Sequence, residues 1–313
     1  MALLVILALM LSPAMPRRPV IEKAFPPRLS AASWIAYDET FEYEVDSHHA
    51  DRRAPMASTA KLMTALLVVE RADPSEEVVI SRRAEATNHK QIRLRRGETW
   101  TVGELLEALM VVSANDAAVA LAEHVGGDVA SFVELMNARA GELGLAGTAY
   151  ANPHGLDAPG QFTTAGDLLV LGRQVMGNPV LAGLASRTTA ELVGGDGSVR
   201  RFPSTNELLS SFDGAIGVKT GWTSGAGDVL VAAAEREGHR VYAVVMGSDD
   251  ANADAAALLE FSFAVFGNVE RRLLPLMEDR QQADRVQAAL SEETLSRVAH
   301  LLAMWKREVS GWQ

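Results

Sequence analysis

The chain has 313 residues, of which 48% are hydrophobic and 22% are charged, proportions close to the average for globular proteins. This composition excludes disordered, collagen-like and coiled-coil chains, and the length corresponds to one or two domains. The net charge of −11 argues against a nucleic-acid partner, and the absence of cysteine excludes disulfides, thiolate nucleophiles and cysteine-based zinc sites.

The N-terminus has the pattern of a signal peptide. The apolar run Ala2–Leu11 precedes Ser12-Pro13-Ala14, a small-x-small sequence of the kind that signal peptidase cleaves. The run has ten residues, whereas a membrane-spanning helix needs about 20. We predict a signal peptide over residues 1–16, a linker over residues 17–29 and export to the cell envelope. No basic residue precedes the run, and the alternative is a buried N-terminal segment.

Two strands and a helix are predicted after the linker. Residues 32–37 and 41–45 alternate between apolar and polar positions, which predicts a β-hairpin. Residues 59–72 have apolar positions at helical spacing, and Ser58 stands where a helix N-cap is expected. From residue 101 to about 177 helical patterns dominate, which predicts a helical subdomain. Its breaks fall at residues 111–115, 126–127 and 152–160.

After Pro179 the hydrophobic period changes to two, and the chain reads as a meander. Three strands are predicted over residues 214–221, 229–234 and 240–247, with a tight turn at Glu237-Gly238-His239. A last helix is predicted over residues 251–266. The layout predicts an α+β fold: an antiparallel sheet flanked by helices, an inserted mainly helical subdomain, and a cleft between the two.

One serine and one lysine stand at a spacing that suits nucleophilic chemistry. Among the five lysines only Lys61 has a serine, Ser58, three residues upstream. On a helix this spacing places the two side chains one turn apart on the same face. A neutral amine can act as the base that activates a hydroxyl, but its pKa must first fall by about three to four units from about 10.4. Burial and a second cation can lower it that far.

Two further motifs extend this pair. Ser113-Ala114-Asn115 falls in a break between predicted helices, where the serine could relay a proton and the asparagine could hold an amide. Lys219-Thr220-Gly221 lies on a predicted strand and supplies the second cation. Gly221 within that strand indicates close approach of another backbone, such as a substrate added as a strand. Ser-x-x-Lys, Ser-x-Asn and Lys-Thr-Gly together are typical of β-lactamases and penicillin-binding proteins.

The sequence resembles the D-alanyl-D-alanine carboxypeptidases of peptidase family S11, which are low-molecular-mass penicillin-binding proteins of the β-lactamase/transpeptidase-like superfamily. The resemblance covers about residues 30–267, which we take as a serine D,D-peptidase domain. Five blocks of sequence carry it, at residues 57–66, 113–118, 152–157, 205–209 and 217–223.

The resemblance implies an exported enzyme that removes the terminal D-alanine of peptidoglycan stem peptides and is acylated by β-lactam antibiotics, without a metal or other cofactor. It implies that Ser58 is the nucleophile, Lys61 the general base and Ser113 a proton relay. The substrate-binding residues that it implies are Asn115 for the substrate amide, Lys219 and Thr220 for the terminal carboxylate, and Gly221 and Trp222 on the same strand. The backbone N–H groups of Ser58 and Trp222 would form the oxyanion hole.

Several features leave alternatives open. Thr205 stands where some relatives have an arginine beside the carboxylate site. Residues 268–313 predict a mainly helical tail that packs on the domain or, less favoured, contacts the membrane.

Other functions fit the same motifs. A D,D-endopeptidase or a non-catalytic sensor of penicillin or peptidoglycan would carry them. A class A β-lactamase is disfavoured because no Glu-x-x-Leu-Asn stands between Ser113 and Lys219. His154 is expected to be structural and Asp116 to cap a helix.

Overall fold

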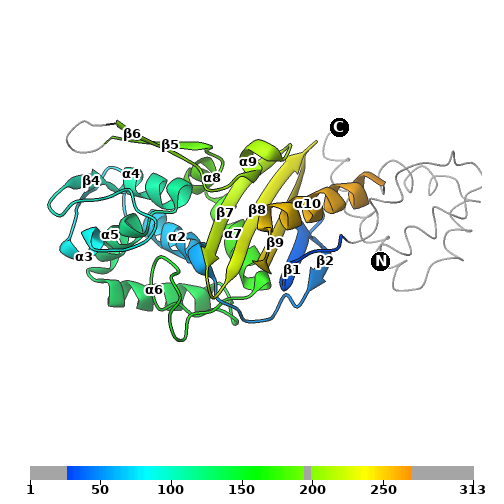
Figure 1. Ribbon diagram of the computed structural model, residues 1–313, viewed down its shortest axis with the longest axis horizontal. Coiled ribbons are helices and arrows are strands. Elements are labelled where there is room, and N and C mark those ends of the chain that lie inside the picture. The colour runs from blue at the N-terminus through cyan, green and yellow to red at the C-terminus, as the bar shows by residue number, and fades with distance from the viewer. Residues whose placement is uncertain (1–26, 194–198, 269–313) are drawn as a thin grey trace, which may run out of the picture.

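The computed structural model describes residues 27–193 and 199–268 (Figure 1). The predicted signal peptide, most of the predicted linker and the predicted tail beyond residue 268 lie outside these residues. Within residues 27–193 and 199–268 no single helix is long and apolar enough to cross a membrane. Helices α7 (Ala165–Gly177) and α8 (Pro179–Ala185) have the length and composition only when taken together, and they are bent by 107°.

A five-stranded antiparallel sheet organises the fold. Its strand order is β2-β1-β9-β8-β7, so β7 forms one free edge. The strands are β1 (Ser33–Asp38), β2 (Tyr43–His48), β7 (Ala215–Thr223), β8 (Gly227–Arg236) and β9 (His239–Ser248). Both the predicted hairpin and the predicted meander are confirmed. The β8–β9 turn has positive φ at Glu237 (51°) and Gly238 (81°), the geometry of a two-residue turn that matches the strand twist.

The central strands are buried on both faces. On β8, Val229 and Val231 belong to the larger core, whereas Leu230 and Ala232 belong to a second core on the other face. Helix α10 (Ala251–Asn268) covers this second face (Figure 1). The helices inserted between β2 and β7 form the larger core with the first face. The predicted α+β fold, with a helical block beside an antiparallel sheet, is confirmed.

The inserted block contains most of the helices and two small two-stranded sheets. The helices are α2 (Lys61–Arg71), α3 (Arg82–Glu85), α4 (Val102–Glu107), α5 (Asn115–Gly126), α6 (Val129–Glu142), α7 (Ala165–Gly177), α8 (Pro179–Ala185) and α9 (Leu208–Ser211), with a 3₁₀ turn η2 (Ala57–Ala60) and a π-helical turn η3 (Ala108–Val112). In these sheets β3 (Glu77–Val79) pairs with β4 (Thr99–Thr101), and β5 (Thr189–Val193) pairs with β6 (Val199–Pro203).

The prediction of strand pattern directly after Pro179 was wrong, because residues 179–185 form α8. The Asn178 side chain accepts hydrogen bonds from the backbone N–H groups of Val180 and Leu181, and Pro179 stands at the first helical turn. Proline is well tolerated there because its missing N–H would be unpaired in any case. The N-cap at Asn178 and the burial of Leu181 and Leu184 favour a helix here more strongly than the local sequence pattern favours a strand.

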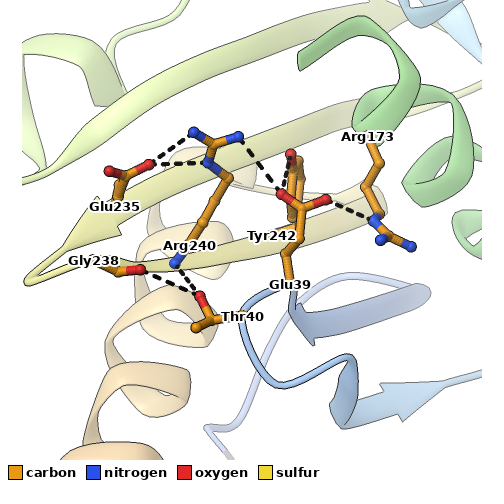
Figure 2. Close-up of polar contacts among 7 residues, drawn as sticks. All are labelled: Glu39, Thr40, Arg173, Glu235, Gly238, Arg240 and Tyr242. Atoms are coloured by element: carbon orange, nitrogen blue, oxygen red, sulfur yellow. Dashed lines mark hydrogen bonds and ion pairs between the residues drawn. The ribbon is translucent and has the colours of Figure 1, made fainter. Parts of the chain in front are cut away.

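A polar network closes the end of the sheet at the β1–β2 and β8–β9 turns (Figure 2). The carboxylate of Glu39 accepts hydrogen bonds from Arg173 of α7 at 2.9 Å and from Tyr242 at 3.3 Å, and it lies 3.6 Å from Arg240. Arg240 also forms a pair with Glu235. The network ties α7 to the sheet, and α7 in turn packs against α2, which begins at Lys61.

Candidate active site

Ser58 lies inside the turn η2, which runs directly into α2. The N-cap of η2 is Met56 and that of α2 is Ala60, and neither makes a side-chain capping bond. The prediction that Ser58 caps the helix was therefore wrong. Its hydroxyl is instead 3.0 Å from the amine of Lys61, which is the one-turn approach that the spacing predicts.

The amine of Lys61 is completely buried and has three oxygen neighbours. Besides Ser58 Oγ, the Nζ atom lies 2.7 Å from Asn115 Oδ1 and 2.7 Å from the carbonyl oxygen of His154. A carbonyl oxygen can only accept, so these two contacts use both hydrogens of a neutral amine. The remaining lone pair is then directed at the Ser58 hydroxyl. A neutral Lys61 is arranged to take the proton of Ser58.

The electrostatic surroundings favour the neutral form of Lys61. Burial lowers its pKa well below the ordinary value, and the charges of Lys219 and Lys90 lower it further, against a smaller opposing effect of Asp116. Burial, together with the charge of Lys90, lowers the pKa of Lys219 to about 7. Three cations around one site cannot all be charged without cost, and this drives Lys61 towards neutrality.

Ser113 and Asn115 enter the site from the break between η3 and α5. Ser113 adopts a left-handed conformation with φ 64°, and its buried hydroxyl makes no hydrogen bond with any part of the chain that the structure describes. The side-chain nitrogen of Asn115 donates to the carbonyl of Asn88 at 3.1 Å. Its side-chain oxygen holds Lys61, so this amide links the base to the residue 88–90 segment.

Asp116 does not cap α5, as the sequence suggested, because the N-cap is Ala114. Its buried carboxylate accepts hydrogen bonds from the backbone N–H groups of Ile92 at 3.2 Å and Leu94 at 3.1 Å. Burial raises its pKa despite these bonds. Asp116 thereby fixes the segment that follows Lys90 against the start of α5.

The edge strand β7 supplies the opposite wall. Lys219 is buried and donates to the carbonyl of Thr220 at 3.0 Å, and the hydroxyl of Thr220 lies 2.7 Å from that of Thr205. A Cβ atom on Gly221 would be 2.8 Å from the backbone nitrogen of Ser58. The close backbone neighbour predicted at Gly221 is thus the chain's own η2 turn. Trp222, which is 67% exposed, stands at the rim.

The two walls enclose a cleft of about 820 Å³. Six of the residues predicted for the site line it: Ser58, Ser113, Asn115, Thr220, Gly221 and Trp222. Lys61 and Lys219 are buried, Lys61 within hydrogen-bond distance of two of these residues and Lys219 on the strand that carries three of them. The structure therefore brings every predicted site residue together. A hydroxyl beside a neutral amine, in a cleft with a cation on its wall, is suited to acyl transfer from a substrate that carries a carboxylate.

Four further residues have parts in the site, and of these the sequence indicated only Thr205, beside the carboxylate site. The backbone carbonyl of His154 is a partner of Lys61, while burial and nearby cations lower the pKa of its ring to about 3, so the ring is neutral. Lys90 lines the cleft, Thr205 pairs with Thr220, and the carboxylate of Asp157 accepts from Thr223 at 2.8 Å. A backbone acceptor has no side-chain signal, but Lys90 was one of only five lysines.

Replacing Gly155 by alanine is expected to distort the Ser58 turn. Gly155 has φ +90°, and a Cβ atom there would lie 1.7 Å from the carbonyl oxygen of Ala57. Strain and overpacking together should lower the free energy of unfolding by about 3 kcal/mol, measured by urea denaturation. Gly160→Ala is the matched control, because Gly160 has φ +79° in the same loop but open space around its Cβ position. Equal losses in the two variants would contradict the packing role of Gly155.

Solved structures with the same fold identify the class of protein. The DD-transpeptidase of Streptomyces K15 matches with a TM-score of 0.72 and 31% identity, over 77% of this chain and 99% of that one. A D-alanyl-D-alanine carboxypeptidase from Mycobacterium tuberculosis H37Rv matches with a TM-score of 0.72 and 32% identity, over 77% of this chain and 93% of that one. The fold is that of the serine DD-peptidases of the penicillin-binding type.

The family model described as D-alanyl-D-alanine carboxypeptidase, peptidase S11, matches residues 21–250. The chain belongs to this family, as the resemblance implied. The carboxypeptidase DacC of Escherichia coli K12 is 36% identical over 234 residues, 71% of this chain, and DacF of Bacillus subtilis 168 is 34% identical over 226 residues, 69% of this chain. The chain spans 58% of the length of DacC and 57% of that of DacF.

Proposed function

We propose that the protein is a serine D-alanyl-D-alanine carboxypeptidase that acts outside the cytoplasmic membrane on peptidoglycan stem peptides and is acylated by β-lactams. The observation that carries the proposal is the 3.0 Å approach of the buried Lys61 amine to the Ser58 hydroxyl, with both amine hydrogens directed at carbonyl oxygens. Family membership and the proposed site of action support each other, because the substrate lies in the cell wall.

In the proposed acylation step the lone pair of Lys61 takes the proton of Ser58 while Ser58 Oγ bonds to the carbonyl carbon between the two D-alanines. The developing oxyanion is held by the backbone N–H groups of Ser58 and Trp222, a type of donor worth about 10²–10³ in rate. The carbon–nitrogen bond then breaks, and the leaving amine receives the proton from Lys61 through the hydroxyl of Ser113. D-Alanine departs, and a water molecule hydrolyses the Ser58 ester with the same residues returning the proton.

The remaining residues position the substrate. The charge of Lys219 and the hydroxyls of Thr220 and Thr205 suit the terminal carboxylate, and Thr205 supplies a neutral donor where some relatives have arginine. Asn115 holds Lys61 through its oxygen and has one N–H left for the substrate amide. Gly221 keeps β7 against the Ser58 turn.

Acylation of the wild-type protein by penicillin should add one adduct to its intact mass, and Ser58→Ala should add none. Ser224→Ala is the matched control, since this serine also lines the cleft but has no part in the proposed chemistry. A stoichiometric adduct on Ser58→Ala would overturn the assignment of the nucleophile.

Incubation with a peptide that ends in D-Ala-D-Ala separates the alternatives. The carboxypeptidase releases free D-alanine from the peptide. An endopeptidase releases none and cleaves a cross-linked dimer instead, and a sensor is acylated without turnover. Release of D-alanine by wild type and not by Ser58→Ala is the result that we expect.

A further inference from the structure

Lys90 lines the cleft on the side formed by the inserted helical block, opposite Lys219 on β7. It lines the cleft together with Ser58, Ser113 and Asn115, and its charge acts on both buried lysines. Across the parts of the chain that the structure describes, its ammonium makes no ion pair and no hydrogen bond. The whole chain has a net charge of −11, so the unpaired positive charge of Lys90 contrasts with the acidic character of the chain.

The backbone of Lys90 is held in place by Asn115, a residue of the candidate active site. Its backbone carbonyl accepts from the backbone nitrogen of Asn115 at 2.8 Å, and the carbonyl of Asn88 accepts from the Asn115 side chain at 3.1 Å. Asp116 holds the residues that follow. Because Asn115 also holds Lys61, the residue 88–90 segment and the general base share one anchor, which holds the backbone of Lys90 beside the cleft.

We propose that Lys90 is a specificity-determining residue that binds an anionic side chain on the residue preceding the two D-alanines. The inference rests on the proposed function, in which β7 takes the terminal carboxylate through Lys219 and Thr220. A peptide lying between β7 and the helical wall then directs its upstream side chain towards Lys90. A carboxylate there would satisfy the unpaired ammonium and would ease the repulsion among the three lysines. The predicted substrate class is a stem peptide whose third residue has a free carboxylate.

The test compares two acetylated tripeptides that end in D-Ala-D-Ala, one with L-2-aminoadipate and one with L-lysine as the preceding residue. The measured quantity is the ratio of kcat/KM for the anionic peptide to that for the cationic peptide. Effects of a mutation on the general base act on both peptides and cancel in the ratio. Wild type should favour the anionic peptide by about five- to tenfold, Lys90→Gln by less than about twofold, and Lys90→Glu should favour the cationic peptide.

Arg96→Glu is the matched charge-reversal control, because Arg96 is exposed in the same loop and lies outside the cleft lining. It should leave the wild-type ratio within about twofold. An unchanged ratio in both Lys90 variants, or an equal shift in Arg96→Glu, would overturn the inference while cleavage of either peptide still supports the proposed function. If wild type cleaves neither peptide and is not acylated by penicillin, the proposed function fails and the inference fails with it.

Discussion

Lys61→Met is expected to slow the acylation of Ser58 by penicillin by about 10³-fold, within the range of about 10²–10⁴ found for general bases. Methionine fills the buried space but has no lone pair basic enough to take the Ser58 proton. The measurement is the second-order rate of adduct formation by stopped-flow fluorescence or intact mass. Acylation within about tenfold of the wild-type rate would show that another group accepts the proton.

Because the chain has no cysteine, the amine of Lys61 can be removed and then restored chemically. In Lys61→Cys the new thiol is the only one in the chain. Alkylation with 2-bromoethylamine in denaturant, followed by refolding, places an amine at nearly the position of the lysine Nζ, whereas iodoacetamide places a neutral amide there. The amine should restore most of the lost rate and the amide none. Equal rates for the two products would argue against a basic role.

The kcat/KM for a D-Ala-D-Ala peptide is expected to have a bell-shaped dependence on pH. Lys61 acts as a neutral base, so activity rises as the pH rises through its lowered pKa. Lys219 acts as a cation towards the terminal carboxylate, so activity falls as the pH rises through about 7, where the ammonium loses its proton. Both limbs report pKa values of the free enzyme, because the pH dependence of kcat/KM follows the ionisations of the enzyme without bound substrate.

Lys219→Gln provides the control for the alkaline limb. It should lower the maximal kcat/KM and remove the fall above about pH 7, since no titrating cation then remains beside Thr220. The acid limb should persist and move towards higher pH, because the charge of Lys219 no longer lowers the pKa of Lys61. An alkaline limb that survives unchanged in this variant would contradict the role of Lys219.

The meander and the site motifs could be predicted because their signals are local. Strand β8 is a continuous apolar run, as expected for a strand buried on both faces, and the β8–β9 turn has the glycine that its positive φ requires. Ser58 and Lys61 needed only the spacing of one helical turn. Their order with Ser113 and Lys219 along the chain then specified a known constellation.

Other features depend on tertiary contacts that no local pattern encodes. Ser58 was predicted as a cap, but β7 packs against the turn at Gly221 and the hydroxyl is directed to Lys61. Asp116 was predicted as a cap, but its carboxylate binds the backbone of a loop more than 20 residues away. Lys90 lies in an irregular segment, and only the bonds of that segment to Asn115 bring it to the cleft.

The most direct test is an NMR titration of the lysine side chains. The chain has five lysines, so a sample labelled at lysine Nζ and Cε gives five resonances, and Lys61→Met and Lys219→Gln assign two of them. Ser58→Ala should be titrated in parallel, because it removes the hydroxyl without removing the amine. We expect the Lys61 resonance to report a neutral amine near neutral pH in both proteins. A Lys61 resonance that stays protonated up to about pH 10, like an exposed lysine, would contradict the account.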